Sequence, residues 1–275
     1  MRTPGDEQAD LLVRARAALL DSLEALAEQR AAVIVIGAQA VYLRTGGIDV
    51  ALAEATKDSD VALDPRLLVD VPRVEAAMQD AGFAPDVNGQ PGAWVNPDGI
   101  PVDLMVPEQL AGAGGRRGAR IPPHGSRATR RARGIEAVLV DHDPLVVRSL
   151  DSVDQRAVTV NVAGAAALLV AKLHKIAERV GSPTRLNDKD AHDSYRLLRA
   201  SDTSTLRTSF ECLLEHELCG DVTRQALEYL DSLFAAGPDA LGCTMAGRAE
   251  EGVGEPEQVA VAVSLLAGDL LASLR

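Results

Sequence analysis

Two acidic residues at alternate positions are the first candidates for chemistry in this chain. Asp58 and Asp60 belong to the segment DSDVALD (58–64), whose alternation of acidic and apolar residues predicts a strand with one polar face. Side chains at i and i+2 of a strand point the same way, about 6.6 Å apart at ~3.3 Å per residue. Such carboxylates repel each other unless a cation lies between them, and hard oxygen ligands suit Mg²⁺. Asp103 offers a third carboxylate, because it interrupts an otherwise apolar strand predicted over residues 100–106.

A plainer interpretation of the Asp58–Asp60 pair is that strand ends often carry solvated aspartates. The residues upstream favour the functional interpretation. The run AAVIVIG (31–37) predicts a short buried strand that stops at a glycine, and the residues from Ala38 to Leu43 predict the start of a helix. The backbone amides at the start of a helix favour an anion, so an anionic ligand could be held there beside a metal.

Length and composition exclude several classes of protein. The 275 residues, 47% of them hydrophobic, can bury a substantial core and rule out global disorder. No run approaches ~18 apolar residues, so we expect no membrane span and no membrane partner. The acidic N-terminal stretch lacks the apolar core of a signal peptide. Three cysteines are too few for a disulfide framework or a zinc site, and we expect a cytoplasmic protein.

The charge of the chain is uneven. The formal net charge of −12 opposes non-specific nucleic-acid binding, yet residues 112–133, called here the basic segment, contain no acidic residue. Its seven arginines are Arg116, Arg117, Arg120, Arg127, Arg130, Arg131 and Arg133. Three interpretations stay open: a solvated loop, a surface for a protein partner, or a guide for an RNA backbone or substrate phosphates. The turn at Pro122-Pro123-His124-Gly125 predicts a hairpin-like arm.

The order of elements predicts an α+β half followed by a helical half. Before residue 163, helices are expected over 7–30 and 71–83, and a hairpin joins strands 93–95 and 100–106 through the turn Asn96–Gly99. Further strands are expected over 136–140, 145–150 and 157–162. Beyond Gly164, helices are expected over 165–179, 189–200, 203–219, 221–236 and 257–274. We therefore divide the chain into an α+β domain of residues 1–162 and a helical domain of residues 163–275.

Charged pairs at helical spacing form a second group of candidates. Lys172 and Lys175 lie three residues apart on one face of a predicted helix, as do Asp190 and Asp193 on the next helix. The lysines could form a solvated basic edge or bind phosphate. Asp190 could stabilise the start of its helix through the helix dipole, or belong to a functional site.

Together these motifs resemble the nucleotidyltransferase superfamily, and within it the AbiEii-like group, which includes toxins of toxin–antitoxin pairs. The resemblance covers roughly residues 30–200. Its matching motifs are Gly37-Ala38 after a buried strand, Thr56-Lys57-Asp58-Ser59-Asp60, Val102-Asp103-Leu104, Lys172-Leu173 and Lys189-Asp190-Ala191-His192-Asp193. Where the family loop carries a second glycine or serine, this chain has Ala38, which keeps the backbone amide and has no hydroxyl.

The resemblance implies a fold and a set of roles. It implies a nucleotidyltransferase-like mixed β-sheet with flanking helices, followed by the helical domain, with the catalytic cleft between the two. Asp58 and Asp60 would bind Mg²⁺, and Asp103 would bind a second metal ion and lower the pKa of the acceptor hydroxyl, so that two metal ions hold the attacking and leaving oxygens in line. The implied nucleotide-binding residues are Gly37, Ala38 and Lys57, and Lys175 would take the place of Lys172 if the helix is rotated. Lys172 would neutralise the leaving pyrophosphate, and Asp190 would orient this lysine or help to deprotonate the acceptor.

The implied reaction transfers a nucleoside monophosphate from an NTP to an acceptor and releases pyrophosphate. By resemblance, a tRNA 3′ end is the leading acceptor, with inhibition of translation as the toxic outcome and an antitoxin protein as a possible partner. A protein hydroxyl (AMPylation) and a small molecule such as an antibiotic are alternative acceptors. A catalytically inactive module that only binds is a further alternative.

Overall fold

In a computed structural model the chain forms two compact units. The structure describes residues 4–46, 58–87, 89–113 and 117–275. Unit 1 comprises Met1–Ala40, Ala55–Ile135 and His142–Ala163, and unit 2 comprises Val41–Glu54, Glu136–Asp141 and Gly164–Arg275. Two short stretches that precede residue 163 thus belong with the helical half.

Unit 1 is built on a mixed β-sheet. Its strands are β1 (Val33–Ile36), β2 (Ser59–Leu63), β3 (Ala84–Pro85), β4 (Ala93–Val95), β5 (Pro101–Pro107), β6 (Arg130–Ala132), β7 (His142–Arg148) and β8 (Ala157–Ala163). The strand order is β3-β4-β5-β2-β1-β8-β7, and β6 pairs with β5. The expected mixed sheet with helices is confirmed at this level. Features specific to nucleotidyltransferases stay a prediction.

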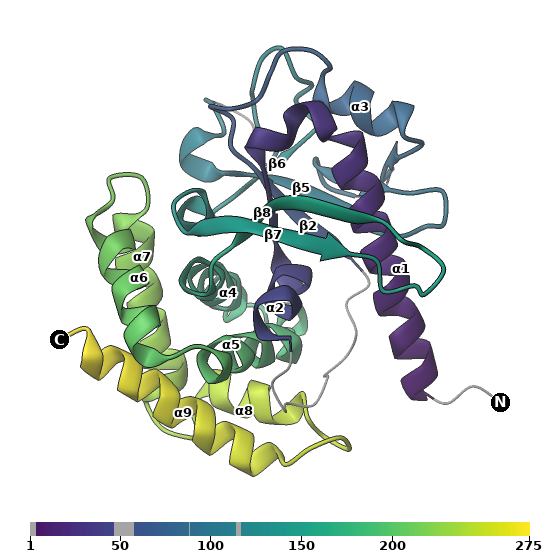
Figure 1. The fold of residues 1–275 in the computed structure, drawn as a ribbon. Helices are drawn as coiled ribbons and strands as arrows, with labels where there is room; N and C mark the ends of the chain where they lie inside the picture. The colour runs from purple at the N-terminus through teal and green to yellow at the C-terminus, as the bar shows by residue number, and fades with distance from the viewer. Residues whose placement is uncertain (1–3, 47–57, 88, 114–116) are drawn as a thin grey trace. The chain divides into compact units, whose positions relative to one another are not determined.

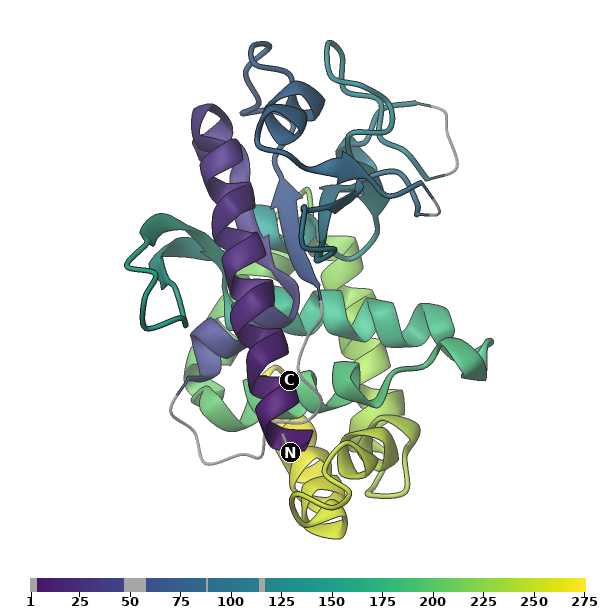
Figure 2. The ribbon, with the colours of Figure 1, turned by 90° about the vertical axis from the view of Figure 1, so that its right-hand side faces the viewer.

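Helices complete unit 1. The long helix α1 (Pro4–Ala25) packs against β2, β5 and β8 and runs across the sheet (Figures 1 and 2). Leu19 and Leu23 of α1 are fully buried, because apolar residues at helical spacing form one stripe along it. The remaining helices are α3 (Val74–Asp80), the start of α2 (Gly37–Thr45), and the 3₁₀ turns η1 (Ala27–Ala32) and η2 (Glu108–Leu110).

The centre of the sheet brings the predicted acidic strands together. Strand β1 is antiparallel to β2, and β2 is parallel to β5. All four residues of β1 are buried, as expected for a continuous β-branched run. The predicted hairpin is confirmed, since β4 and β5 pair in antiparallel register across the turn at Asn96–Gly99.

Unit 2 is helical. Its main helices are α4 (Ala165–Arg179), α5 (Asp188–Ala200), α6 (Thr203–Glu215), α7 (Gly220–Leu230), α8 (Leu241–Arg248) and α9 (Pro256–Ser273). Helix α4 packs against α5 and α7, and α9 packs against α8. The turns η4 (Pro183–Arg185) and η5 (Asp231–Ala235, a π-helical turn) join helices, and the 3₁₀ turn η3 (Glu136–Leu139) packs on α4 and α7. In the described part of the chain, every helix is too short or too polar to cross a bilayer.

Several predicted elements differ from the structure. The strand expected over 136–140 is wrong: residues 136–139 form η3, whose four side chains are all buried, and Val140 follows in a turn. A short apolar run that is buried on every side cannot be assigned to strand or helix by periodicity. The helix expected over 7–30 ends at Ala25 and continues as η1. The short elements β3, β6 and α8 have no counterpart among the predicted ones.

Candidate active site

Two of the predicted acidic ligands are direct neighbours in the sheet of unit 1. In the parallel β2–β5 register, Asp60 lies opposite Asp103. Paired residues on adjacent strands project from the same face of a sheet, and the strands are ~4.8 Å apart. We call Asp60 and Asp103 the carboxylate pair. Both are partly exposed, so the pair is accessible to solvent.

The start of helix α2 is fitted to this pair. Gly37 has a left-handed φ of 66°, which permits the chain to turn directly from β1 into the helix. A Cβ atom at Gly37 would lie 2.1 Å from Oδ2 of Asp60. The absent side chain therefore leaves the space that the Asp60 carboxylate occupies. Ala38 is buried, and it contributes a second backbone amide to the first turn of the helix.

Asp58 is exposed and directly precedes β2, two residues before Asp60. Within the described residues, no group of three or more His, Cys, Asp or Glu side chains is placed to hold a metal ion. The three predicted ligands are thus not gathered into one group, and two of them are paired. Mg²⁺ usually takes one or two carboxylates and keeps several waters. The two paired carboxylates, with Asp60 seated against Gly37, therefore fit this ion. Magnesium binding stays a prediction.

An arginine of the basic segment contacts the carboxylate pair. Nη2 of Arg130 lies 2.7 Å from Oδ2 of Asp103, and the two side chains are 27% and 20% exposed. Arg130 begins β6, whose parallel register on β5 sets Arg130 opposite Met105. The sequence analysis assigned this arginine to RNA or phosphate. No pattern in the sequence indicated its contact with Asp103, because the contact depends on the pairing of two strands distant in the chain.

The rest of the basic segment is a folded arm. The Ala119 amide donates to the Thr129 carbonyl at 3.1 Å, and Gly118 forms a bridge with Arg130, so the expected hairpin-like arm is confirmed. Arg131 donates to the carbonyl of Gly112 at 2.9 Å and thereby tethers the arm.

The arginines of this arm divide by exposure. Those exposed to solvent are Arg117, Arg120, Arg127 and Arg133. They are the members of the predicted set that an RNA or a partner protein could reach. Arg116 and Lys57, together with Thr56, lie outside the described residues.

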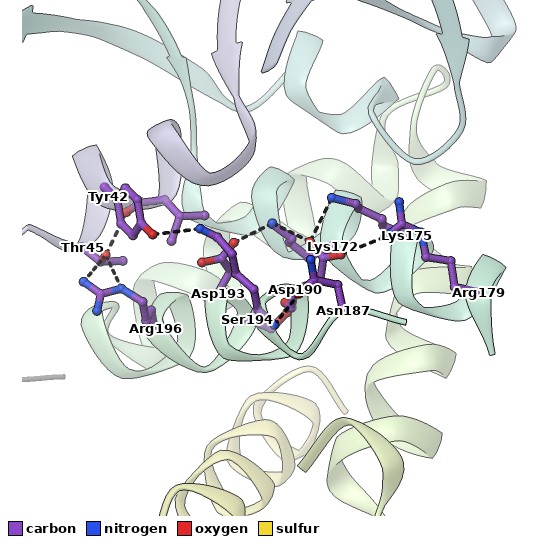
Figure 3. Close-up of polar contacts among 12 residues, drawn as sticks. Tyr42, Thr45, Lys172, Lys175, Arg179, Asn187, Asp190, Asp193, Ser194 and Arg196 are labelled. Carbon is purple, nitrogen blue, oxygen red and sulfur yellow. Dashed lines mark hydrogen bonds and ion pairs between the residues drawn. The ribbon is translucent and has the colours of Figure 1, made fainter. Parts of the chain in front are cut away.

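The predicted lysines and aspartates of unit 2 form a compact cluster (Figure 3). Nζ of Lys172 donates to Oδ1 of Asp190 at 2.9 Å and to Oδ2 of Asp193 at 2.6 Å. Lys175 and Arg179 also contact the Asp190 carboxylate, at 3.0 and 3.3 Å. We call these five residues the lysine–aspartate cluster. Lys172 is buried at its centre, whereas the side chain of Lys175 is 41% exposed.

Electrostatics keep the cluster charged. Burial alone would lower the pKa of Lys172, but the charges of Asp190 and Asp193 outweigh it and raise this pKa above its usual value. Burial alone would raise the pKa of Asp190, but the charges of Lys172 and Lys175 lower it below its usual value. The predicted contact of Lys172 with a triphosphate stays a prediction, and the structure shows this lysine already bound by two carboxylates.

Helix α5 also anchors the last turn of α2 within unit 2. Nζ of Lys189 donates to the Tyr42 hydroxyl at 2.9 Å and lies 5.0 Å from the centre of its ring. The guanidinium of Arg196 lies on the same ring, 5.7 Å from its centre, and contacts Thr45 Oγ1. Asn187 caps α5 by accepting a hydrogen bond from the Lys189 amide. The expected role of Asp190 in stabilising the start of its helix is compatible with its place in the first turn.

Comparison with models of known protein families, with curated proteins and with solved structures finds no match to this chain. The interpretation of the site therefore depends on its own geometry and on the sequence motifs. Two contacts were missed from the sequence: the Arg130–Asp103 ion pair, and the buried pair of His192 and Glu250, whose Nε2 and Oε1 atoms are 2.8 Å apart.

Proposed function

We propose that the protein is a Mg²⁺-dependent nucleotidyltransferase that moves a nucleoside monophosphate from an NTP to an acceptor, with a tRNA 3′ end as the leading acceptor. The observation that carries the proposal is the carboxylate pair on neighbouring strands, with Asp60 seated against Gly37 at the start of α2. Acidic ligands beside a helix N-terminus combine a site for a cation with donors for phosphate oxygens.

The chain would contribute two functions at this site. Asp60, with Asp58 two residues before it, would hold Mg²⁺, which when bound polarises phosphate oxygens and stabilises developing charge. The amides of Gly37 and Ala38 would orient the phosphates through the helix dipole. In the reaction, the acceptor hydroxyl oxygen bonds to the α-phosphorus, the bond from this phosphorus to the bridging oxygen breaks, and pyrophosphate leaves. The hydroxyl proton passes to water.

The exposed arginines of the folded arm support an RNA acceptor. They carry positive charge on an otherwise acidic protein, and the arm is joined by β6 to the strand that bears Asp103. Arginine binds phosphate oxygens with a planar fork of donors, so the arm is suited to an RNA backbone. An antitoxin that binds the same arm would present an acidic surface to these arginines.

The decisive experiment incubates the full chain with Mg²⁺, total tRNA and each of the four NTPs labelled at the α-phosphate. We expect label on tRNA, and none when EDTA removes the metal. Label on the protein itself would identify self-modification, and label on an added small hydroxyl compound would identify that acceptor class. Absence of transfer to every acceptor, together with absence of NTP binding, would contradict the enzyme and favour a binding module.

A further inference from the structure

We propose that unit 2 holds a binding site for a small organic cation, an ammonium group attached to an apolar body. The site is a cavity of about 780 Å³ that opens between helix α5, helix α9 and the loop of residues 249–255. This volume is typical of sites for small molecules. The cavity includes no residue of the carboxylate pair or of the basic segment, so the inference is independent of the proposed nucleotide transfer.

A buried carboxylate lines this cavity. Glu250 is 5% exposed, and its Oε1 atom lies 2.8 Å from Nε2 of the buried His192. Among the described residues, the other carboxylate oxygen, Oε2, accepts no hydrogen bond. A buried carboxylate oxygen that lacks a donor is costly. Glu250 is therefore suited to a ligand that supplies this donor.

The neighbours of Glu250 leave its negative charge in place. Burial lowers the pKa of His192, so its ring is neutral at pH 7 and donates the Nε2 hydrogen to the carboxylate. Arg199 also lines the cavity, but its guanidinium donates to the Tyr195 hydroxyl and forms no ion pair with Glu250 in the described part of the chain. A ligand that carries a positive charge would balance the charge of Glu250.

Helix α9 supplies the apolar side of the cavity. Val259, Ala262 and Leu266 recur at spacings of three and four, so they share one face of this helix. Leu265 lies beside them and is 64% exposed, which leaves the cavity open to solvent. Tyr195 adds an aromatic ring from α5, and aromatic rings attract cations. Apolar and aromatic surface beside a carboxylate is the chemistry that recognises an organic ammonium ion.

Titration of the full chain with two matched probes at pH 7 tests the site. 4-Phenylbutylammonium carries a positive head, and 4-phenylbutyrate carries a negative head on an apolar body of nearly the same size. By isothermal titration calorimetry, we expect one site per chain for the cation and binding of the anion at least about tenfold weaker. Glu250→Gln should weaken binding of the cation at least about tenfold. Glu251→Gln removes an exposed charge from the next residue, which does not line the cavity, and should leave binding unchanged.

Two further variants test the site even if Glu250→Gln does not fold. A Cβ atom at Gly254 would overlap Oε2 of Glu250, so Gly254→Ala should displace the carboxylate and weaken binding of the cation. Leu265→Ser should weaken it roughly threefold through lost apolar contact. Val261→Ser, a change at an exposed residue of α9 outside the cavity, is the control.

Three results would overturn the inference. They are the absence of saturable binding of 4-phenylbutylammonium, equal or tighter binding of 4-phenylbutyrate, and an equal loss of binding in Glu250→Gln and Glu251→Gln. Circular dichroism confirms that each variant is folded. The comparison of the two probes uses the wild-type chain and depends on no variant.

Discussion

The carboxylate pair of unit 1 and the lysine–aspartate cluster of unit 2 use the same residue types in opposite ways. In unit 2, two aspartates are buried, and Lys172 between them has two carboxylate partners within 3 Å. In unit 1, Asp103 is partly exposed, and Arg130 contacts one of its carboxylate oxygens while the buried Nε of Arg130 has no hydrogen-bond acceptor among the described residues.

This difference indicates which group is suited to ligands. Buried charges that satisfy each other stabilise a fold only when every partner is present, and they have little capacity for an additional ion. Partly exposed carboxylates on neighbouring strands repel each other and gain from a bound cation. We therefore infer that the cluster holds α4 and α5 together, and that the carboxylate pair is the centre of the chemistry.

The largest expected effect is the loss of nucleotide-transfer activity in the Asp60→Asn variant. Loss of this ligand should lower the transfer rate about 10³-fold, since metal stabilisation of the transition state contributes several kcal/mol. The melting temperature should stay the same or rise, because repulsion with Asp103 is relieved. Asp98→Asn, an exposed change in the β4–β5 turn, is the matched control. Wild-type transfer rates in Asp60→Asn would show that the pair is structural.

In the lysine–aspartate cluster, the main effect should be on stability. Lys172→Met should lower the free energy of unfolding by about 3–5 kcal/mol, because it leaves two buried carboxylates without their shared partner. Lys175→Met, whose side chain is 41% exposed, should cost less than about 1 kcal/mol. Urea denaturation measures both. Equal costs for the two variants would contradict the distinction between buried and exposed cations.

A methyl group at the start of α2 should affect the site more than the fold. Gly37→Ala places a side chain at a left-handed φ, which costs about 1–3 kcal/mol, and it displaces the Asp60 carboxylate. We expect transfer and Mg²⁺ binding to fall together. Gly99→Ala is the control, because Gly99 also has a positive φ but an added Cβ would meet no atom within 4 Å. Normal metal binding in Gly37→Ala would contradict the fitted space beside Asp60.

The pH dependence of the free energy of unfolding should reflect the charged state of the lysine–aspartate cluster. The pKa of Asp190 is lowered in the folded protein, so its stabilising contribution is present above the unfolded value of about 3.9 and is lost as pH falls through the folded value. Asp190→Asn should therefore be less stable than wild type at pH 7, and the two unfolding free energies should converge below about pH 4. A difference that is constant from pH 7 to pH 3 would contradict the charged state of Asp190.

The smallest effect expected concerns the arm. Replacing Arg117, Arg120 and Arg127 by glutamine should reduce the slope of log binding constant against log salt by about 2–3 for tRNA. A control triple variant neutralises exposed arginines of unit 2: Arg185, Arg207 and Arg224. Equal slopes in wild type and the arm variant would leave a solvated loop or a protein partner as the role of the arm.

Strong local patterns were sufficient to predict most elements. The β-branched run before Gly37, the β4–β5 hairpin and the helix at 165–179 all form near their predicted bounds. The spacing of apolar residues did not predict side-chain exposure where a helix is buried on most of its surface. Helix α4 has buried residues on most of its surface, including Lys172, so the spacing of its lysines could not indicate which one meets solvent.

The sequence alone determined the acidic candidates, the glycine before the helix and the basic segment, because each depends on residue type and on spacing within a few positions. Only the tertiary structure decided that Asp60 lies opposite Asp103, that Arg130 contacts Asp103, and that Lys172 is enclosed by two aspartates. These contacts join segments that are 18 to 43 residues apart, counting from 172 to 190 and from 60 to 103. Such contacts depend on strand order and on helix packing. Both are determined by the free energy of the whole fold, so the sequence of one segment cannot predict them.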